Sequence, residues 1–174
     1  MTIAFVFPGQ GSQSLGMLAE LATIHTTVQS TFAEASDALA YDLWQLVQEG
    51  PEAELNKTTK TQPALLASSV AMWRVWNEVS QSQPVMMAGH SLGEYSALVC
   101  SGAITFEDAI QLVADRGAYM QDAVPEGTGS MAAVLGLDEN QVEEVCQRAS
   151  QGQIVSAANF NSPGQIVIAG HREA

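Results

Sequence analysis

A chain of 174 residues, 47% hydrophobic and 14% charged, has the composition of a folded globular protein rather than a disordered one. Its 6 Lys and Arg against 19 Asp and Glu give a formal net charge of −13, which argues against a general nucleic-acid or anionic-membrane surface. Two distant cysteines and three scattered histidines predict a reduced, cytoplasmic protein without a metal site, and no apolar run is long enough to span a membrane.

The chain begins with a continuous apolar run, residues 3–7, which is typical of a strand in a buried parallel sheet. The loop that follows, residues 8–13, contains two glycines but matches neither of the common phosphate-binding patterns, so nucleotide binding is not predicted. One interpretation is a plain turn. The other is a loop beside a catalytic residue that supplies an oxyanion donor near Gln10.

Helical patterns then cover most of the chain up to residue 79. Helices are predicted over residues 14–39, 41–48, 52–55 and 64–79, the last one beginning after Pro63. The cations of this region, Lys57, Lys60 and Arg74, are each interpreted as solvated surface charges. As a group they are a weak candidate for a docking patch.

The next segment has the pattern of a nucleophile elbow. An apolar run, residues 85–88, is followed by a serine between two glycines at G-x-S-x-G spacing, and then by a helical pattern. This spacing also occurs by chance, but the strand before it and the helix after it favour Ser91 as a nucleophile. The N–H of Leu92, at the start of that helix, is then available to an oxyanion. His90 is not predicted to be the general base, because a neighbour in the turn should point away from the hydroxyl.

A further helix is predicted from Phe106 to about Ala123, with Thr105 as its cap. Arg116 falls beside or within the apolar stripe of this helix, so it needs an anionic partner. That partner could be one of the chain's many acidic side chains, in a structural salt bridge. It could equally be a substrate carboxylate, which the planar guanidinium binds through two parallel hydrogen bonds.

The composition changes after a glycine-rich joint at residues 125–129, and a domain boundary is predicted between residues 126 and 127. Beyond it, a strand at 130–136, a helix up to about residue 150 and strands at 154–158 and 165–169 give β-α-β-β. The predicted fold class is therefore α/β. A large subdomain, 1–126, has a parallel sheet and an elbow of the α/β-hydrolase type, and 127–174 is part of a small ferredoxin-like subdomain.

With these elements placed, the sequence resembles the malonyl-CoA:acyl carrier protein transacylases, and also the acyltransferase domains of polyketide synthases. The matching segments occur in order along the chain: FVFPGQGSQ at 5–13, TQPA at 61–64, GHSLGEYSAL at 89–98, DRGAYMQ at 115–121 and AANFNSPGQIVIAG at 157–170. The resemblance implies an enzyme of fatty acid biosynthesis that carries a malonyl group on a serine. Its partners would be malonyl-CoA and acyl carrier protein, whose own phosphopantetheine receives the malonyl group, so no bound cofactor is expected.

The resemblance also implies roles for individual residues. Ser91 would be the nucleophile, Gln10 and the backbone N–H of Leu92 would form the oxyanion hole, and Arg116 would bind the malonyl carboxylate. Asn159 and Asn161 are expected to lie near the cleft.

One departure from the family is large. Members are nearly twice as long, and their general-base histidine lies in a later motif, which His25, His90 and His171 do not match. We therefore expect an N-terminal portion against which the C-terminal half of the same enzyme packs. Two alternatives remain: a serine thioesterase or esterase, which would share the elbow, and a non-catalytic fragment that lacks its base.

Overall fold

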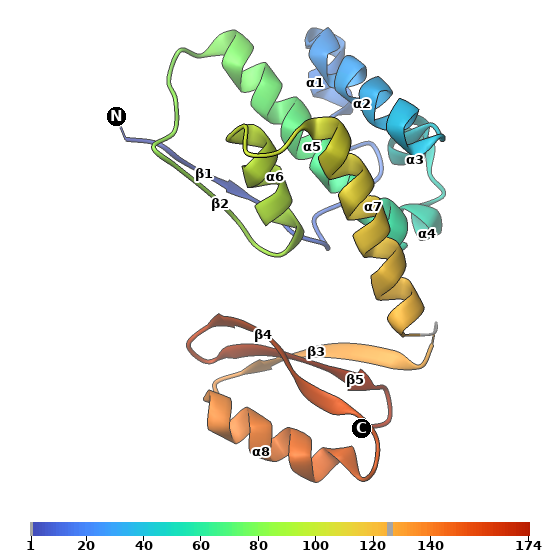
Figure 1. Cartoon of the computed structure of the whole chain (residues 1–174), viewed down its shortest axis with the longest axis vertical. Helices are drawn as coiled ribbons and strands as arrows, with labels where there is room; N and C mark the ends of the chain where they lie inside the picture. The colour runs from blue at the N-terminus through green and yellow to red at the C-terminus, as the bar shows by residue number, and fades with distance from the viewer. Residues whose placement is uncertain (1, 125–126) are drawn as a thin grey trace. The chain divides into compact units, whose positions relative to one another are not determined.

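The computed structural model describes residues 2–124 and 127–174, and it divides the chain into two units, Met1–Met120 and Gln121–Ala174 (Figure 1). The division falls within a helix and differs by a few residues from the boundary predicted between 126 and 127. Pro125 and Glu126, which adjoin that predicted boundary, lie outside the described residues. The subdomain boundary therefore stays a prediction, and the two units are described separately below.

The first unit combines two parallel strands with seven helices in its described part. The strands pair in register from Ala4 with Met86 to Phe7 with Gly89. The elements are β1 (Ala4–Phe7), α1 (Ala19–Ile24), α2 (Thr26–Leu39), α3 (Leu43–Glu49), α4 (Glu52–Leu55), α5 (Thr58–Val79), β2 (Met86–Gly89), α6 (Leu92–Cys100) and α7 (Phe106–Ala123).

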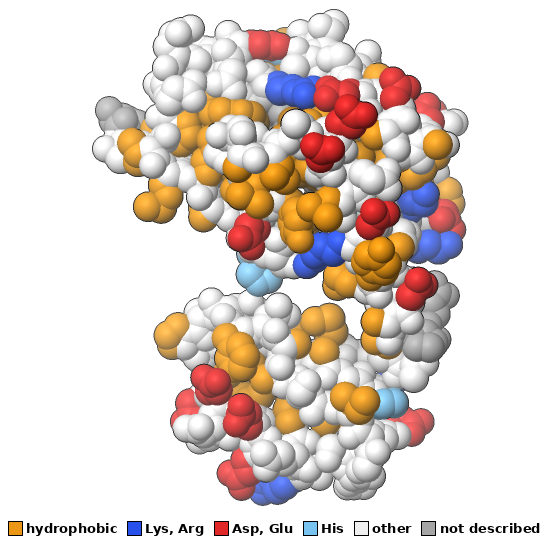
Figure 2. Space-filling model, viewed as in Figure 1, with side chains coloured by type: hydrophobic (Ala, Val, Ile, Leu, Met, Phe, Trp, Pro, Cys, Tyr) orange, Lys and Arg blue, Asp and Glu red, His pale blue; other side chains and the backbone are white. Residues whose placement is uncertain are grey.

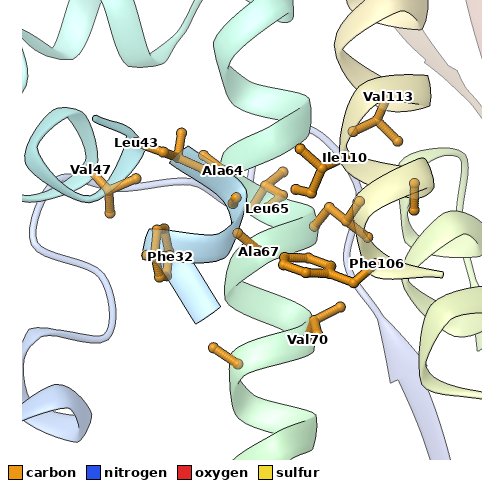
Figure 3. Close-up of a cluster of buried hydrophobic side chains, with 14 of the residues drawn as sticks. Phe32, Leu43, Val47, Ala64, Leu65, Ala67, Val70, Phe106, Ile110 and Val113 are labelled. Carbon is orange, nitrogen blue, oxygen red and sulfur yellow. The ribbon is translucent and has the colours of Figure 1, made fainter. Parts of the chain in front are cut away.

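Helix α5 is the centre of the first unit's core, because every residue from 61 to 71 on it is buried. A helix that is buried on all sides needs neighbours all round, and the small residues Ala64 and Ala67 let these neighbours approach closely. Figure 3 shows α5 between Phe32 of α2 on one side and Ile110 of α7 on the other. The core therefore fixes α5 and α7 to each other.

The β1-β2 sheet is covered on one face only. Phe5 packs edge-on against Trp73 and Trp76 of α5. On the opposite face Val6 is 79% exposed and Met86 is 65% exposed, because alternate residues of a strand point to opposite sides. Parallel sheets are ordinarily covered on both faces, so this apolar face is unusual for a folded chain.

Two helix boundaries differ from the sequence prediction. The helix predicted over 14–39 is two helices, with residue 14 outside both and His25 extended between them; the β-branched residues on either side of His25 weaken a continuous helix. Helix α5 begins at Thr58, six residues before the predicted start, with Pro63 inside it. A proline there costs about 3 kcal/mol of helix stability, which the burial of the surrounding turns offsets.

The second unit is an antiparallel sheet with one helix on it, the β-α-β-β order predicted from the sequence. Its elements are β3 (Gly129–Leu135), α8 (Glu139–Ser150), β4 (Val155–Ser162) and β5 (Gln165–His171), with β5 between β3 and β4. Asp138 caps α8 in a reciprocal pair with Gln141, and Val142 and Cys146 of α8 are buried with Ile166. This order is the first part of the ferredoxin-like unit.

The hairpin of the second unit is longer than predicted. Residues 159–162, expected in a loop, continue β4, and the turn is reduced to Pro163 and Gly164. Proline followed by a glycine with φ of +76° is the sequence of a tight turn. In the part of the chain that the structure describes, no helix is both long and apolar enough to cross a membrane.

Candidate functional site

Ser91 lies at the corner between β2 and α6. Its φ of 54° and ψ of −109° lie outside the regions that residues with a side chain ordinarily adopt, which costs about 1–3 kcal/mol. Ser91 occupies the N-cap position of α6, yet its hydroxyl does not cap the helix. The residue is exposed, so its Oγ is free of a structural task and open to a substrate.

The two glycines of the motif are needed because three backbone segments meet at this corner. A Cβ on Gly89 would lie 1.9 Å from the carbonyl carbon of Gly93. A Cβ on Gly93 would lie 2.2 Å from the carbonyl oxygen of Phe7, at the end of β1. Any side chain at either position would therefore push apart the strands and the helix that hold Ser91.

The predicted oxyanion donors lie on either side of this corner. Leu92 is the first residue of α6, so its N–H precedes the helical hydrogen-bond ladder. The loop after β1 approaches from the other side: a Cβ on Gly9 would lie 3.0 Å from the carbonyl oxygen of His90. Gln10, the next residue, donates from Nε2 to Oγ1 of Thr58 at 3.2 Å, which ties the loop to the start of α5.

Arg116 of α7 contacts the nucleophile directly. Its Nη2 donates to Ser91 Oγ at 3.0 Å, and its Nη1 donates to Oε1 of Gln62 at 2.7 Å. The Tyr95 ring lies 5.6 Å from the guanidinium carbon. Among the described residues Arg116 forms no ion pair with an acid, so the salt-bridge interpretation that spacing left open is not what this structure contains.

Arg116 is a positive charge in a chain whose formal net charge is −13. Figure 2 shows acidic side chains spread over both units, with apolar side chains visible between them. A guanidinium that faces a nucleophile without a carboxylate partner attracts an anionic substrate group, and its planar fork fits a carboxylate. The hydrogen bond that Arg116 donates also stabilises negative charge on Ser91 Oγ as the serine loses its proton. It leaves the serine O–H able to face a base.

Two of the histidines have partners other than Ser91. His25 Nδ1 lies 3.3 Å from Glu78 Oε2, and His171 Nδ1 accepts from the backbone N–H of Ile154 at 3.0 Å. The ring of His90 lies beside Gly9.

Cys100, the last residue of α6, is a poor nucleophile. Burial raises the pKa of the Cys100 thiol to about 12, so it stays protonated and unreactive at neutral pH. In the described portion of the chain no group of three or more His, Cys, Asp or Glu side chains could hold a metal ion.

The three cations of the weak docking patch each have a local partner. Arg74 pairs with Glu34 at 2.6 Å, Lys57 pairs with Glu54, and Lys60 lies 3.4 Å above the Tyr41 ring. Burial lowers the pKa of Lys60 from its ordinary value, chiefly by removing water.

Sequence reasoning missed two polar residues that hold the site, Thr58 and Gln62. They are four residues apart on α5 and therefore lie on one face of it, where they contact Gln10 and Arg116 respectively. The signal for Gln62 is its place in the segment TQPA, whereas Thr58 lies outside every matching segment. Pro63 predicts a helix start that excludes both residues. Asn159 lies on β4 in the second unit, opposite Val167, and its place near the cleft stays a prediction, as does that of Asn161.

Comparison with known proteins places the chain among acyltransferases. A model of the acyl transferase domain family matches residues 4–174. The malonyl CoA-acyl carrier protein transacylase of Salmonella typhimurium is 64% identical over 171 residues, which cover 98% of this chain and 55% of that relative.

Solved structures agree with the sequence relatives. A malonyl-transacylase structure, solved in complex with its type II polyketide synthase acyl carrier protein, matches with a TM-score of 0.92 and 65% identity, covering 99% of this chain and 56% of that one. The malonyl CoA-acyl carrier protein transacylase of Coxiella burnetii matches with a TM-score of 0.93 and 57% identity, covering 99% and 55%. The chain spans about half the length of the curated relatives it matches. The family model covers nearly all of its residues, and by that match the chain belongs to the acyl transferase domain family.

Proposed function

We propose that this chain carries the nucleophilic and acyl-binding part of an acyl-carrier-protein S-malonyltransferase. The enzyme moves a malonyl group from coenzyme A to the phosphopantetheine thiol of acyl carrier protein, in fatty acid biosynthesis. The observation that supports this most directly is the 3.0 Å hydrogen bond from Arg116 Nη2 to Ser91 Oγ. In a malonyl group one methylene separates the reacting carbonyl from the carboxylate, so nucleophile and cation must be close neighbours. The printed names of the relatives point to the same substrates.

The proposed reaction has two acyl transfers. Ser91 Oγ attacks the thioester carbonyl, and the Leu92 N–H and Gln10 stabilise the negative oxygen that forms. The C–S bond then breaks, and coenzyme A leaves with the proton that the serine lost. The thiol of the carrier protein attacks the seryl ester in the same way and regenerates Ser91. The general base is assigned to the part of the enzyme found in the longer relatives, as the resemblance implies.

The proposal also defines the surroundings of the enzyme. It needs no cofactor of its own, because phosphopantetheine is carried by the partner, and it works in the cytoplasm without nucleic acid or a membrane. We assign the exposed apolar face of the β1-β2 sheet, with Val6 and Met86, to contact with the C-terminal half of the same enzyme.

Intact mass spectrometry of the purified chain before and after incubation with malonyl-CoA tests the proposal. We expect a slow malonyl-sized mass increase in the unsubstituted chain, because binding and the oxyanion hole act without the general base, and no increase in Ser91→Ala. Ser101→Ala, which removes an exposed serine at the end of α6, serves as the matched control and should keep the increase. Addition of acyl carrier protein should then move the label to the carrier.

The two alternatives give different results in the same experiment. A thioesterase or esterase would turn over simple esters and release free acid without transfer to the carrier, and it would have no use for Arg116 beside its serine. A folded chain that takes no label would support the non-catalytic fragment. The three histidines of the chain, His25, His90 and His171, match no general-base motif of the family, and this favours the second alternative.

A further inference from the structure

Gln62 is a polar side chain at a fully buried position, which is unusual. It lies in the second turn of α5, on the buried stretch of that helix, and none of its surface is exposed. Buried amides are retained where both ends of the amide find partners, since an unpaired one costs free energy. Both ends of Gln62 do: Oε1 accepts from Arg116 Nη1 at 2.7 Å, and Nε2 donates to Met120 Sδ at 3.4 Å.

Chemistry fixes which end of the amide faces Arg116. A guanidinium has only donors, so the amide oxygen must face it, and the NH₂ group must face the weakly accepting thioether of Met120. A cationic donor on the oxygen and a weak acceptor on the NH₂ group thus hold the amide in one orientation. The rigid amide in turn holds the guanidinium with Nη2 on Ser91 Oγ.

All partners of Arg116 in the described structure are neutral: the Gln62 amide, the Ser91 hydroxyl and the Tyr95 ring. Arg74, which lies on α5 like Gln62, shows the contrasting arrangement. The carboxylate of Glu34 lies 2.6 Å from its Nη1 and offsets its charge. One arginine is therefore compensated within the fold, and the other is held in place with its charge uncompensated.

We propose that Gln62 is a positioning residue that determines specificity: its neutral oxygen fixes Arg116 without cancelling the charge, and so reserves that charge for a carboxylate on the acyl group. This inference rests on the proposed function. A glutamate at position 62 would have nearly the same shape, but it would form an internal ion pair with Arg116. The site would then lose its preference for acyl groups that end in a carboxylate over those that do not.

The test uses binding rather than turnover. In a Ser91→Ala background, which prevents acylation, the dissociation constants of malonyl-CoA and acetyl-CoA are measured by calorimetry for the 174-residue chain. We expect malonyl-CoA to bind about tenfold more tightly or better when residue 62 is glutamine. Gln62→Glu should bring the two ligands within about twofold, with acetyl-CoA affinity unchanged, while Gln62→Met should keep a weakened preference because the charge remains uncompensated. Gln29→Glu, an exposed position on α2, adds the same charge elsewhere and should change nothing.

Each outcome decides a separate point. If Gln62→Glu keeps the full malonyl preference, the inference is wrong and Gln62 is structural only. If Gln62→Met removes the preference as completely as Gln62→Glu, the charge argument is wrong. If Gln62→Glu does not fold, Gln62→Met is measured alone, and a complete loss of the preference in it contradicts the inference. If the glutamine-containing chain itself does not distinguish the two ligands, the proposed function loses its acid-binding arginine and the inference fails with it.

Discussion

At the scale of residues, the site depends on a short chain of contacts from Gln62 through Arg116 to Ser91. The hydroxyl of Ser91 is exposed and does not cap its helix, and a guanidinium lies 3.0 Å from its oxygen. Neither feature contributes to the packed core. Both are arrangements that a purely structural role would not need, since a serine at an N-cap ordinarily accepts a backbone hydrogen bond.

Removal of Arg116 should change substrate choice rather than general reactivity. For Arg116→Ala we expect the rate of seryl ester formation from malonyl-CoA to fall about 10-fold to 100-fold, because a charge-assisted pair is lost, while the rate with acetyl-CoA stays within about twofold. Arg116→Lys should fall between, since an ammonium keeps the charge but not the two-pronged geometry. Initial rates of mass increase measure this. Equal losses for both donors would contradict a carboxylate-binding role.

At the scale of elements, the corner between β2 and α6 is the feature that the sequence predicts best. The G-x-S-x-G spacing, the apolar run before it and the helix after it are local, so they can be identified without knowledge of the rest of the fold. The candidate pair Ser91 and Arg116 follows from this motif and one helical stripe. Their hydrogen bond does not, because it depends on how α6, α7 and the start of α5 pack together.

The misses have tertiary causes that override local preference: burial in one case and strand pairing in the other. Pro63 predicts a helix start, but burial holds the helix together through it from Thr58 onward. Residues 159–162 are polar except for Phe160 and precede Pro163 and Gly164, which favours a loop, but pairing with β5 extends them as a strand. The contacts of Gln62 could not be predicted, because Pro63 places the predicted helix start after it.

Gly93→Ala tests whether close backbone approach holds the elbow. An added Cβ would lie 2.2 Å from a backbone oxygen, which cannot move without shifting β1, so we expect a loss of about 3 kcal/mol or more in the free energy of unfolding. Gly152→Ala is the control: it meets no neighbour within 4 Å but has a φ of +89°, and should cost only about 1 kcal/mol. Urea denaturation compares the two. Equal losses would mean that the close approach at Gly93 is not what requires glycine.

At the scale of the whole molecule, the first unit has a well-packed helical core and a sheet that is covered on one face only. Burial raises the pKa of Cys100 and of Tyr41, each to about 12. The unfolded chain loses these protons first, at about pH 9 and 10, while the folded chain retains them. The stability that the burial of these two protonated groups contributes is therefore fully present below pH 9 and is lost as the pH rises from about 9 to 12.

This alkaline loss can be separated from other titrations. Lys60 acts in the opposite direction, because its lowered pKa makes the folded chain release a proton before the unfolded chain does. We expect Cys100→Ala to flatten the fall in unfolding free energy just above pH 9, although the variant is less stable at neutral pH. Urea denaturation at several pH values from 7 to about 11 measures it. An unchanged slope would show that the thiol is not buried as described.

The most direct test of the central claim is a competition between acyl donors for one serine. The chain is incubated with equal concentrations of malonyl-CoA and acetyl-CoA, and the adducts are separated by intact mass. The account predicts that the malonyl adduct predominates by about tenfold or more and that Ser91→Ala carries neither adduct. Equal amounts of the two adducts, or label that persists in Ser91→Ala, would contradict it.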